Sequence, residues 1–294
     1  MKSKKLKLWV EGARLRTLPL AIAPAAIGAG AADSVQAFDL TLSLLALAVA
    51  LFLQIGVNYA NDYSDGIRGT DDYRVGPLRL TGSKSVKPEA VKLAAFAFFG
   101  LAALSGLAIV FLTGMYWLIA VGAAAIVAAW FYTGGKSPYG YAGLGELAVF
   151  VFFGLVATIG TTFIQVGFIE FNSVLGAIAA GMFASAVLMV NNIRDIETDK
   201  LASKKTLAVI LGKKAATFLF LLMIWLPFVI LAFFVLLYPA TMLGFLTLLL
   251  VIPATVIVLT AKTAKELILV LKLTSFAALA YALSLAAGLF IVFF

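Results

Sequence analysis

The sequence contains no cysteine and no histidine, and only 12% of its 294 residues are charged. Without cysteine the chain forms no disulfide. Without either residue it lacks the usual ligands of zinc, haem iron and iron–sulfur clusters. We therefore expect no haem, and we expect any bound metal to be a hard cation held by oxygen atoms.

The charge deficit is matched by long apolar runs, because 63% of the residues are hydrophobic. These runs are continuous rather than alternating, which predicts an all-α integral membrane protein and argues against a transmembrane β-barrel. The basic N-terminus is not followed by a short apolar core with a cleavage site, so no cleaved signal peptide is expected. We predict one transmembrane domain, 1–294, with nine transmembrane helices at roughly Arg16–Ala32, Leu40–Val57, Val91–Leu112, Tyr116–Phe131, Leu147–Ile164, Val174–Val190, Ala215–Leu237, Met242–Thr260 and Leu273–Phe294.

The positive charges are distributed to one side of these predicted helices. All 22 Lys and Arg residues fall in or beside the N-terminus and four alternate loops, whereas the opposite loops carry only Asp33, Asp39 and Glu170. Since Lys and Arg accumulate in cytoplasmic loops, we expect a cytoplasmic N-terminus and an external C-terminus in the cell membrane. The net charge of +8 is then explained by topology, and no nucleic-acid partner is expected.

Two polar stretches lie at the cytoplasmic ends of the second and sixth predicted helices. Asn61 precedes Asp65 by four residues, and Asn191 precedes Asp195 by the same spacing. Residues four apart share one face of a helix. Because the spacing recurs after 130 residues (191 − 61), we expect the bundle to bring the two stretches together.

Such dense carboxylates need positive charge among them. A solvated network of ion pairs with nearby Lys and Arg is one interpretation, but it does not explain the repeated spacing. Mg²⁺ is usually held by one or two carboxylates together with substrate phosphates and water, and two such sites can clamp one diphosphate. Above an apolar bundle, this arrangement favours a polyprenyl diphosphate whose allylic C–O bond ionises away from water.

Other polar residues have two interpretations. Lys136 is the only charged residue in Thr133–Gly145, and we expect it to bind diphosphate rather than act only as a topology anchor. Arg14 and Arg16 flank the first predicted helix, and we interpret them as topology anchors in preference to substrate contacts. Gln54 is interpreted as a packing residue rather than an acceptor contact.

The motifs resemble those of the UbiA superfamily of intramembrane prenyltransferases, which carry two Asn-x-x-x-Asp-x-x-x-Asp motifs on helices two and six of a nine-helix bundle. Asn191, Asp195 and Asp199 fit the second copy. The first copy departs from the pattern, because Gly69 replaces its last Asp and Asp71 follows two positions later. This form is similar to the 1,4-dihydroxy-2-naphthoate polyprenyltransferase branch. Further similar stretches are Ala13–Pro19, Gly76–Leu80, Tyr139–Glu146 and Lys205–Val209.

The resemblance implies a Mg²⁺-dependent enzyme of menaquinone biosynthesis. It would transfer a polyprenyl chain from polyprenyl diphosphate to 1,4-dihydroxy-2-naphthoate, with loss of CO₂ and pyrophosphate, in a site open to the cytoplasmic face. The expected metal ligands are Asn61, Asp62, Asp65, Asp71, Asn191, Asp195 and Asp199. The expected diphosphate contacts are Asn61, Arg68, Lys136, Asn191, Arg194 and Lys205, and the expected catalytic residues are Asp65, Tyr132, Lys136 and Asp195.

Two alternatives stay open. The first is a prenyltransferase of the same superfamily with another acceptor, such as 4-hydroxybenzoate, homogentisate or a phospholipid precursor. The second is a cation transporter, which we consider remote. Transporters usually hold their coupling residues near the bilayer midplane, whereas the acids here gather at one surface.

Overall fold

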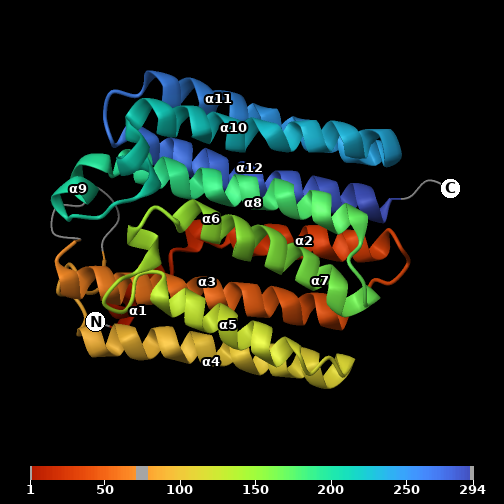
Figure 1. Cartoon of the computed structure of the whole chain (residues 1–294), viewed down its shortest axis with the longest axis horizontal. Coiled ribbons are helices and arrows are strands. Elements are labelled where there is room, and N and C mark those ends of the chain that lie inside the picture. Colours follow the sequence, from red (N-terminus) through yellow and green to blue (C-terminus); the bar gives the residue numbers. More distant parts are fainter. Residues whose placement is uncertain (1, 71–78, 292–294) are drawn as a thin grey trace.

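The computed structural model describes residues 2–70 and 79–291, and all their regular structure is helical. Asp71, an expected metal ligand, lies outside these residues. The long helices lie side by side along the longest axis of the molecule (Figure 1). Their bounds are α1 Lys2–Ala13, α2 Pro19–Asp33, α3 Leu40–Arg68, α4 Pro88–Thr113, α5 Leu118–Phe131, α6 Gly145–Val149, α7 Ala157–Val166, α8 Phe171–Arg194, α9 Ile196–Leu201, α10 Leu207–Leu237, α11 Leu248–Thr260 and α12 Glu266–Phe290.

Several of these helices are long and apolar enough to cross a bilayer, which confirms the prediction of a multi-pass membrane protein. Within the described residues, 7 helical segments meet this criterion, and an eighth is added if Leu6–Thr17 and Pro19–Asp33, bent by 48°, form one span. The remaining predicted span is α5, whose 14 residues measure roughly 21 Å against a hydrocarbon core of about 30 Å. The count of nine spans therefore stays a prediction.

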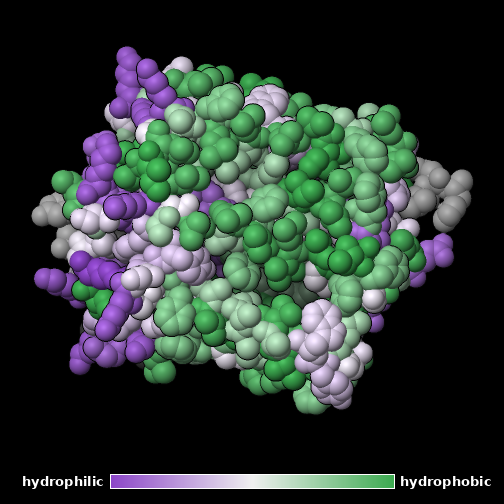
Figure 2. All heavy atoms as spheres, viewed as in Figure 1, coloured by the Kyte–Doolittle hydropathy of each residue, from purple (hydrophilic) through white to green (hydrophobic). Residues whose placement is uncertain are grey.

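The surface has the distribution that a bilayer requires. Hydrophobic side chains form a broad band around the middle of the molecule, and hydrophilic side chains gather at its two ends, most densely at the end that carries α9 (Figure 2). This band faces outward, because many large apolar side chains of α4, α10 and α11 are exposed. Lipid tails are the solvent that such a surface fits.

The core is centred on α8, which packs against α2, α10 and α12. It also packs against a π-helical segment, Phe150–Val156, that joins α6 to α7. A Cβ atom added at Gly154 would lie 2.6 Å from the Cα atom of Gly181. Two glycines thus let the backbones of neighbouring helices touch, as is common where lipid supplies no hydrophobic driving force.

The direction of α3 and α8 determines where the two polar stretches meet. The carboxylates of Asp39 and Glu170 accept main-chain N–H groups at the first turns of α3 and α8, respectively. Both helices then run toward the same end of the molecule, where α3 stops at Gly69 (φ 71°) and α8 stops at Asp195. The C-terminal ends of two helices therefore converge, and helix C-termini favour cations.

Candidate active site

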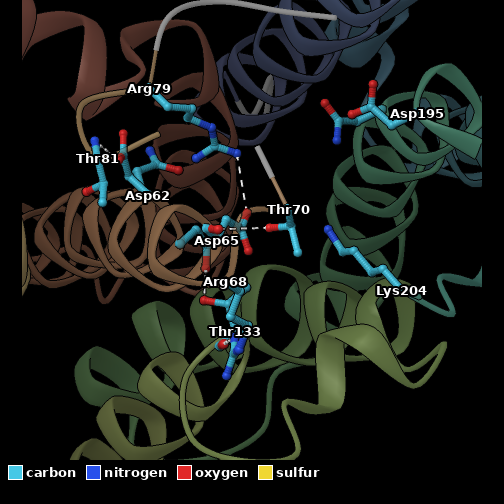
Figure 3. A network of polar contacts seen from close by, with 12 residues as sticks. Asp62, Asp65, Arg68, Thr70, Arg79, Thr81, Thr133, Asp195 and Lys204 are labelled. Carbon is cyan, nitrogen blue, oxygen red and sulfur yellow. Dashed lines mark hydrogen bonds and ion pairs between the residues drawn. The ribbon is translucent and has the colours of Figure 1, made fainter. Parts of the chain in front are cut away.

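A cavity lies where the ends of α3 and α8 meet the segment 132–141, the end of α9 and the loop that follows α9. Residues of both polar stretches line it. They are Asn61, Asp65, Asn191, Asp195 and Asp199. The bundle therefore brings the two stretches together, as their repeated spacing predicted. Figure 3 shows Asp65 and Asp195 on separate helices, with Lys204 on the chain that follows Asp195.

Asp65 is buried, and two of the described residues outside its own helix contact its carboxylate. The Tyr141 hydroxyl donates a hydrogen bond of 2.5 Å to Asp65 Oδ1, and Arg79 Nη2 lies 3.6 Å from Asp65 Oδ2. Burial and the adjacent Asp65 charge raise the pKa of the Tyr141 phenol well above its ordinary value. The phenol therefore keeps its proton at neutral pH and remains a donor to the carboxylate.

Tyr141 also contacts cations from both halves of the site. Lys204 Nζ lies 4.9 Å and the Arg68 guanidinium carbon 5.4 Å from its ring centroid, within the range of cation–π attraction. Its main-chain carbonyl accepts the Lys205 N–H at 3.1 Å. Because Tyr141 bonds Asp65 and also contacts the chain that follows Asp199, it ties the two polar stretches to each other.

The second stretch is organised by neighbouring cations. Arg194 Nε and Nη2 donate to both oxygens of Asp195, at 2.7 and 2.5 Å, and Nη2 also donates to Asn191 Oδ1 at 2.9 Å. Lys204 Nζ lies 3.9 Å from Asp199 Oδ1. Arg194 was expected to bind diphosphate, but its buried guanidinium holds the carboxylate beside it and does not line the cavity.

Asp62 has a different environment from Asp65. Its two oxygens accept the main-chain N–H groups of Leu80 and Thr81, both at 2.8 Å, and the residue is 1% exposed. It does not line the cavity. Asp62 therefore anchors the loop that carries Arg79 to Asp65 (Figure 3), and its expected role as a metal ligand stays a prediction.

Three of the expected diphosphate contacts, Arg68, Lys136 and Lys205, lie at the surface and do not line the cavity. Arg68 donates to the main-chain carbonyls of Thr133 and Gly135. This pairing positions Thr133, whose hydroxyl donates to Asn61 Oδ1 at 2.7 Å.

Tyr132, in contrast, does line the cavity. Burial raises the pKa of its phenol well above the ordinary value. Its hydroxyl is therefore a neutral polar group. Tyr132 was expected among the catalytic residues, and that role stays a prediction.

The sequence named Arg79 and Lys204 only among the nearby basic residues that could pair with the carboxylates, and it gave Tyr141 no role. All three line the cavity. Arg79 and Tyr141 stand in the stretches Gly76–Leu80 and Tyr139–Glu146, which resemble the UbiA superfamily. For Tyr141 that resemblance was the one available signal. No spacing relates either residue to a carboxylate, because both reach the site from loops.

The donor set fits magnesium shared with a phosphorylated substrate. Among residues 2–70 and 79–291, no group of three or more His, Cys, Asp or Glu residues is close enough to hold a metal by itself. Asp65 comes from the end of α3, Asp195 follows the end of α8, and Asp199 lies in α9. Mg²⁺ commonly takes one or two carboxylates and completes its shell with substrate phosphates and water, so these oxygens suit Mg²⁺ bound together with diphosphate.

Comparison with known proteins agrees with this geometry. The UbiA prenyltransferase family matches residues 21–267. The 1,4-dihydroxy-2-naphthoate octaprenyltransferase of Mycobacterium tuberculosis is 49% identical over 281 residues, which cover 96% of each chain. The enzyme of the same name from Escherichia coli is 40% identical over 215 residues, covering 71% of this chain and 70% of that one.

Solved structures share the fold. A UbiA homolog from Aeropyrum pernix superposes with a TM-score of 0.70 at 18% identity, covering 92% of this chain and 96% of that one. A UbiA homolog from Archaeoglobus fulgidus, bound to GPP and Mg²⁺, gives a TM-score of 0.67 at 17% identity, with 95% and 99% covered. From its sequence match, its fold and the two polar stretches in one cavity, the chain belongs to the UbiA prenyltransferase family.

Proposed function

We propose that this protein transfers a polyprenyl chain from polyprenyl diphosphate to 1,4-dihydroxy-2-naphthoate and releases CO₂ and pyrophosphate. The product is demethylmenaquinol, an intermediate of menaquinone biosynthesis. The observation that carries the proposal is the 49% identity, over 96% of both chains, to an enzyme named for this acceptor. The cavity supports it independently, because it combines carboxylates for a metal-bound diphosphate with cations for the phosphate oxygens.

The donor binds through its diphosphate. In this proposal Asp65, Asp195 and Asp199 hold Mg²⁺ jointly with the diphosphate, and Arg79 and Lys204 contact the remaining phosphate oxygens. The side-chain oxygens of Asn61 and Asn191 contribute to the same site. When bound, Mg²⁺ supplies the positive charge that stabilises diphosphate as a leaving group. The roles of Lys136, Lys205, Arg68 and Arg194 at the diphosphate remain predictions of the sequence.

The protein's own contribution is to place the substrates and exclude water. The allylic C–O bond breaks and its electron pair leaves with diphosphate, while the carboxylate-bearing carbon of the electron-rich ring forms a bond to the allylic carbon. The bond from the ring to the carboxylate then breaks, its electron pair restores the aromatic ring, and CO₂ leaves. No proton needs to be removed, so the absence of histidine is no obstacle. The apolar bundle keeps the developing cation from water.

The topology belongs to the same proposal. The single domain 1–294 crosses the cell membrane nine times, with α5 as its shortest span, the N-terminus in the cytoplasm and the C-terminus outside. Supporting this orientation, the hydrophilic end in Figure 2 is the end that carries α9 and the converging ends of α3 and α8. The site then opens to the cytoplasm.

The decisive experiment supplies carboxyl-labelled 1,4-dihydroxy-2-naphthoate, a polyprenyl diphosphate and Mg²⁺ to the purified protein. Released labelled CO₂ and prenylated diol should appear in equal amounts, and both should need Mg²⁺. An Asp195→Asn variant is the control, which should lose about 10²-fold or more in rate. Product that retains the carboxylate, or turnover with 4-hydroxybenzoate alone, would refute the choice of acceptor.

A further inference from the structure

Arg14 stands at the break between α1 and α2 in an unfavourable backbone conformation. Its φ and ψ are 54° and 59°, in the left-handed region. Residues with a Cβ atom rarely adopt this conformation, and they keep it where the surrounding structure enforces it, often at a binding site. The contacts that hold Arg14 in this conformation, and the surroundings of its side chain, therefore indicate its role.

A buried polar network from α3 enforces the break. Asn58 Nδ2 donates to the carbonyl of Ala13 at 2.9 Å and to Thr17 Oγ1 at 3.1 Å. Gln54 Nε2 also donates to Thr17 Oγ1, at 3.2 Å, and the Thr17 hydroxyl donates to the Arg14 carbonyl at 2.9 Å. Gln54 and Asn58 are 7% and 2% exposed. The buried side-chain amides of Gln54 and Asn58 thus hold the chain on both sides of Arg14, whose backbone is strained.

The side chain of Arg14 lines the cavity and has little to bind there. Among the residues that the structure describes, its one hydrogen bond runs from Nη2 to the main-chain carbonyl of Asn58, at 3.4 Å. Two other cavity cations have carboxylate neighbours, with Arg79 3.6 Å from Asp65 and Lys204 3.9 Å from Asp199. A guanidinium carries five N–H donors in a planar fork. Arg14 therefore has most of its donors available for an anion in the cavity.

The position of Arg14 separates it from the acids of α3. The guanidinium contacts α3 at Asn58, seven residues before Asp65, which is roughly 10 Å along the helix axis. This places it on the bilayer side of Asp65. In the proposed function, the diphosphate lies beside the carboxylates at the end of the cavity. The second anionic group that enters the cavity is the carboxylate of the aromatic substrate. A carboxylate removed from water needs a charged partner.

We propose that Arg14 binds the carboxylate of the aromatic acceptor and so selects naphthoates over uncharged naphthols. This inference rests on the proposed function. It adds a substrate-binding role to a residue that we interpreted from the sequence as a topology anchor. The planar fork of arginine matches a carboxylate with two parallel hydrogen bonds, which lysine does not reproduce. Fixed by the network around Thr17, Arg14 orients the carboxylate-bearing carbon while the allylic cation forms.

The test uses Arg14→Gly, because glycine adopts a positive φ without strain, and this variant removes the side chain while sparing the backbone. Lys7→Gln, which removes an exposed cation of α1 outside the cavity, is the control of equal charge. The variant should raise the KM for 1,4-dihydroxy-2-naphthoate by about 10- to 150-fold, the range expected for hydrogen bonds to a charged group. The KM for polyprenyl diphosphate should change by less than about twofold, and Lys7→Gln should behave as the parent.

A competition assay gives a readout that is independent of turnover. The parent should be inhibited more strongly by 1-hydroxy-2-naphthoate than by 1-naphthol, which lacks the carboxylate, and Arg14→Gly should be inhibited equally by both. If Arg14→Gly instead raises the KM for polyprenyl diphosphate, or keeps the parent's preference for the naphthoate, the inference is wrong. If the parent itself does not use 1,4-dihydroxy-2-naphthoate, the proposed function fails first, so the two failures are distinguishable.

Discussion

Removing a single oxygen atom, in Tyr141→Phe, tests whether Asp65 depends on a loop residue for its orientation. The hydroxyl donates to Asp65 Oδ1 at 2.5 Å, while the ring and its contacts with Lys204 and Arg68 remain in the variant. A hydrogen bond to a charged group contributes about 1.5–3 kcal/mol, which corresponds to a loss of roughly 10- to 150-fold in kcat/KM. We expect the apparent affinity for Mg²⁺ to fall as well, because Asp65 then samples other orientations.

The assay is pyrophosphate release from polyprenyl diphosphate and acceptor, followed over a range of Mg²⁺ concentrations. Asp65→Asn and the double variant complete a thermodynamic cycle. If Tyr141 acts through Asp65, the double variant should be no slower than Asp65→Asn alone. If the double variant shows the product of the two single losses, or if Tyr141→Phe stays within twofold of the parent, then Tyr141 does not act through Asp65.

Three further predictions concern topology, the Asp62 anchor and the two lysines. Because the chain has no cysteine, single variants label cleanly: Ser83→Cys should react with an impermeant thiol reagent only from the cytoplasm and Gln36→Cys only from outside, and the reverse pattern would overturn the orientation. Asp62→Asn should lose about 1–3 kcal/mol of stability, because the two main-chain N–H groups bond different carboxylate oxygens and the substitution replaces one of them with an N–H₂ donor. The thermal inactivation midpoint of this variant should fall without a change in its Mg²⁺ dependence. An unchanged midpoint with a weaker response to Mg²⁺ would instead indicate that Asp62 is a metal ligand. Lys204→Ala should raise the KM for polyprenyl diphosphate more than Lys136→Ala, since of the two Lys204 lines the cavity, and equal effects would contradict this ordering.

The sequence predicted the helices better than their ends. Hydropathy located α3, but the helix continues past Val57 to Arg68, because the polar residues Asn61 and Asp65 are stabilised by protein contacts outside the lipid. Hydropathy also could not reveal the π-helical segment at Gly154. That distortion accompanies a backbone contact with Gly181, a partner far away in the sequence.

Within the site, helical spacing indicated which residues line the cavity, whereas density of charge did not distinguish them. Asn61 and Asp65 share a face of α3, and both line the cavity. Asp62 is rotated by about 100° from Asn61 on the same helix, and it binds the loop at Leu80 instead. The contacts of Tyr141 could not be predicted, because a loop residue's neighbours are set by tertiary packing rather than by periodicity.

The shared direction of α3 and α8 has a consequence for product release. Both helices end beside one cavity, so the negative ends of their dipoles add to the charge of the carboxylates. Such a field holds a donor whose charge is compensated by bound cations, but it repels pyrophosphate that has lost its counterions. In the proposed reaction, the helix ends that receive the metal-bound donor therefore also favour departure of the product.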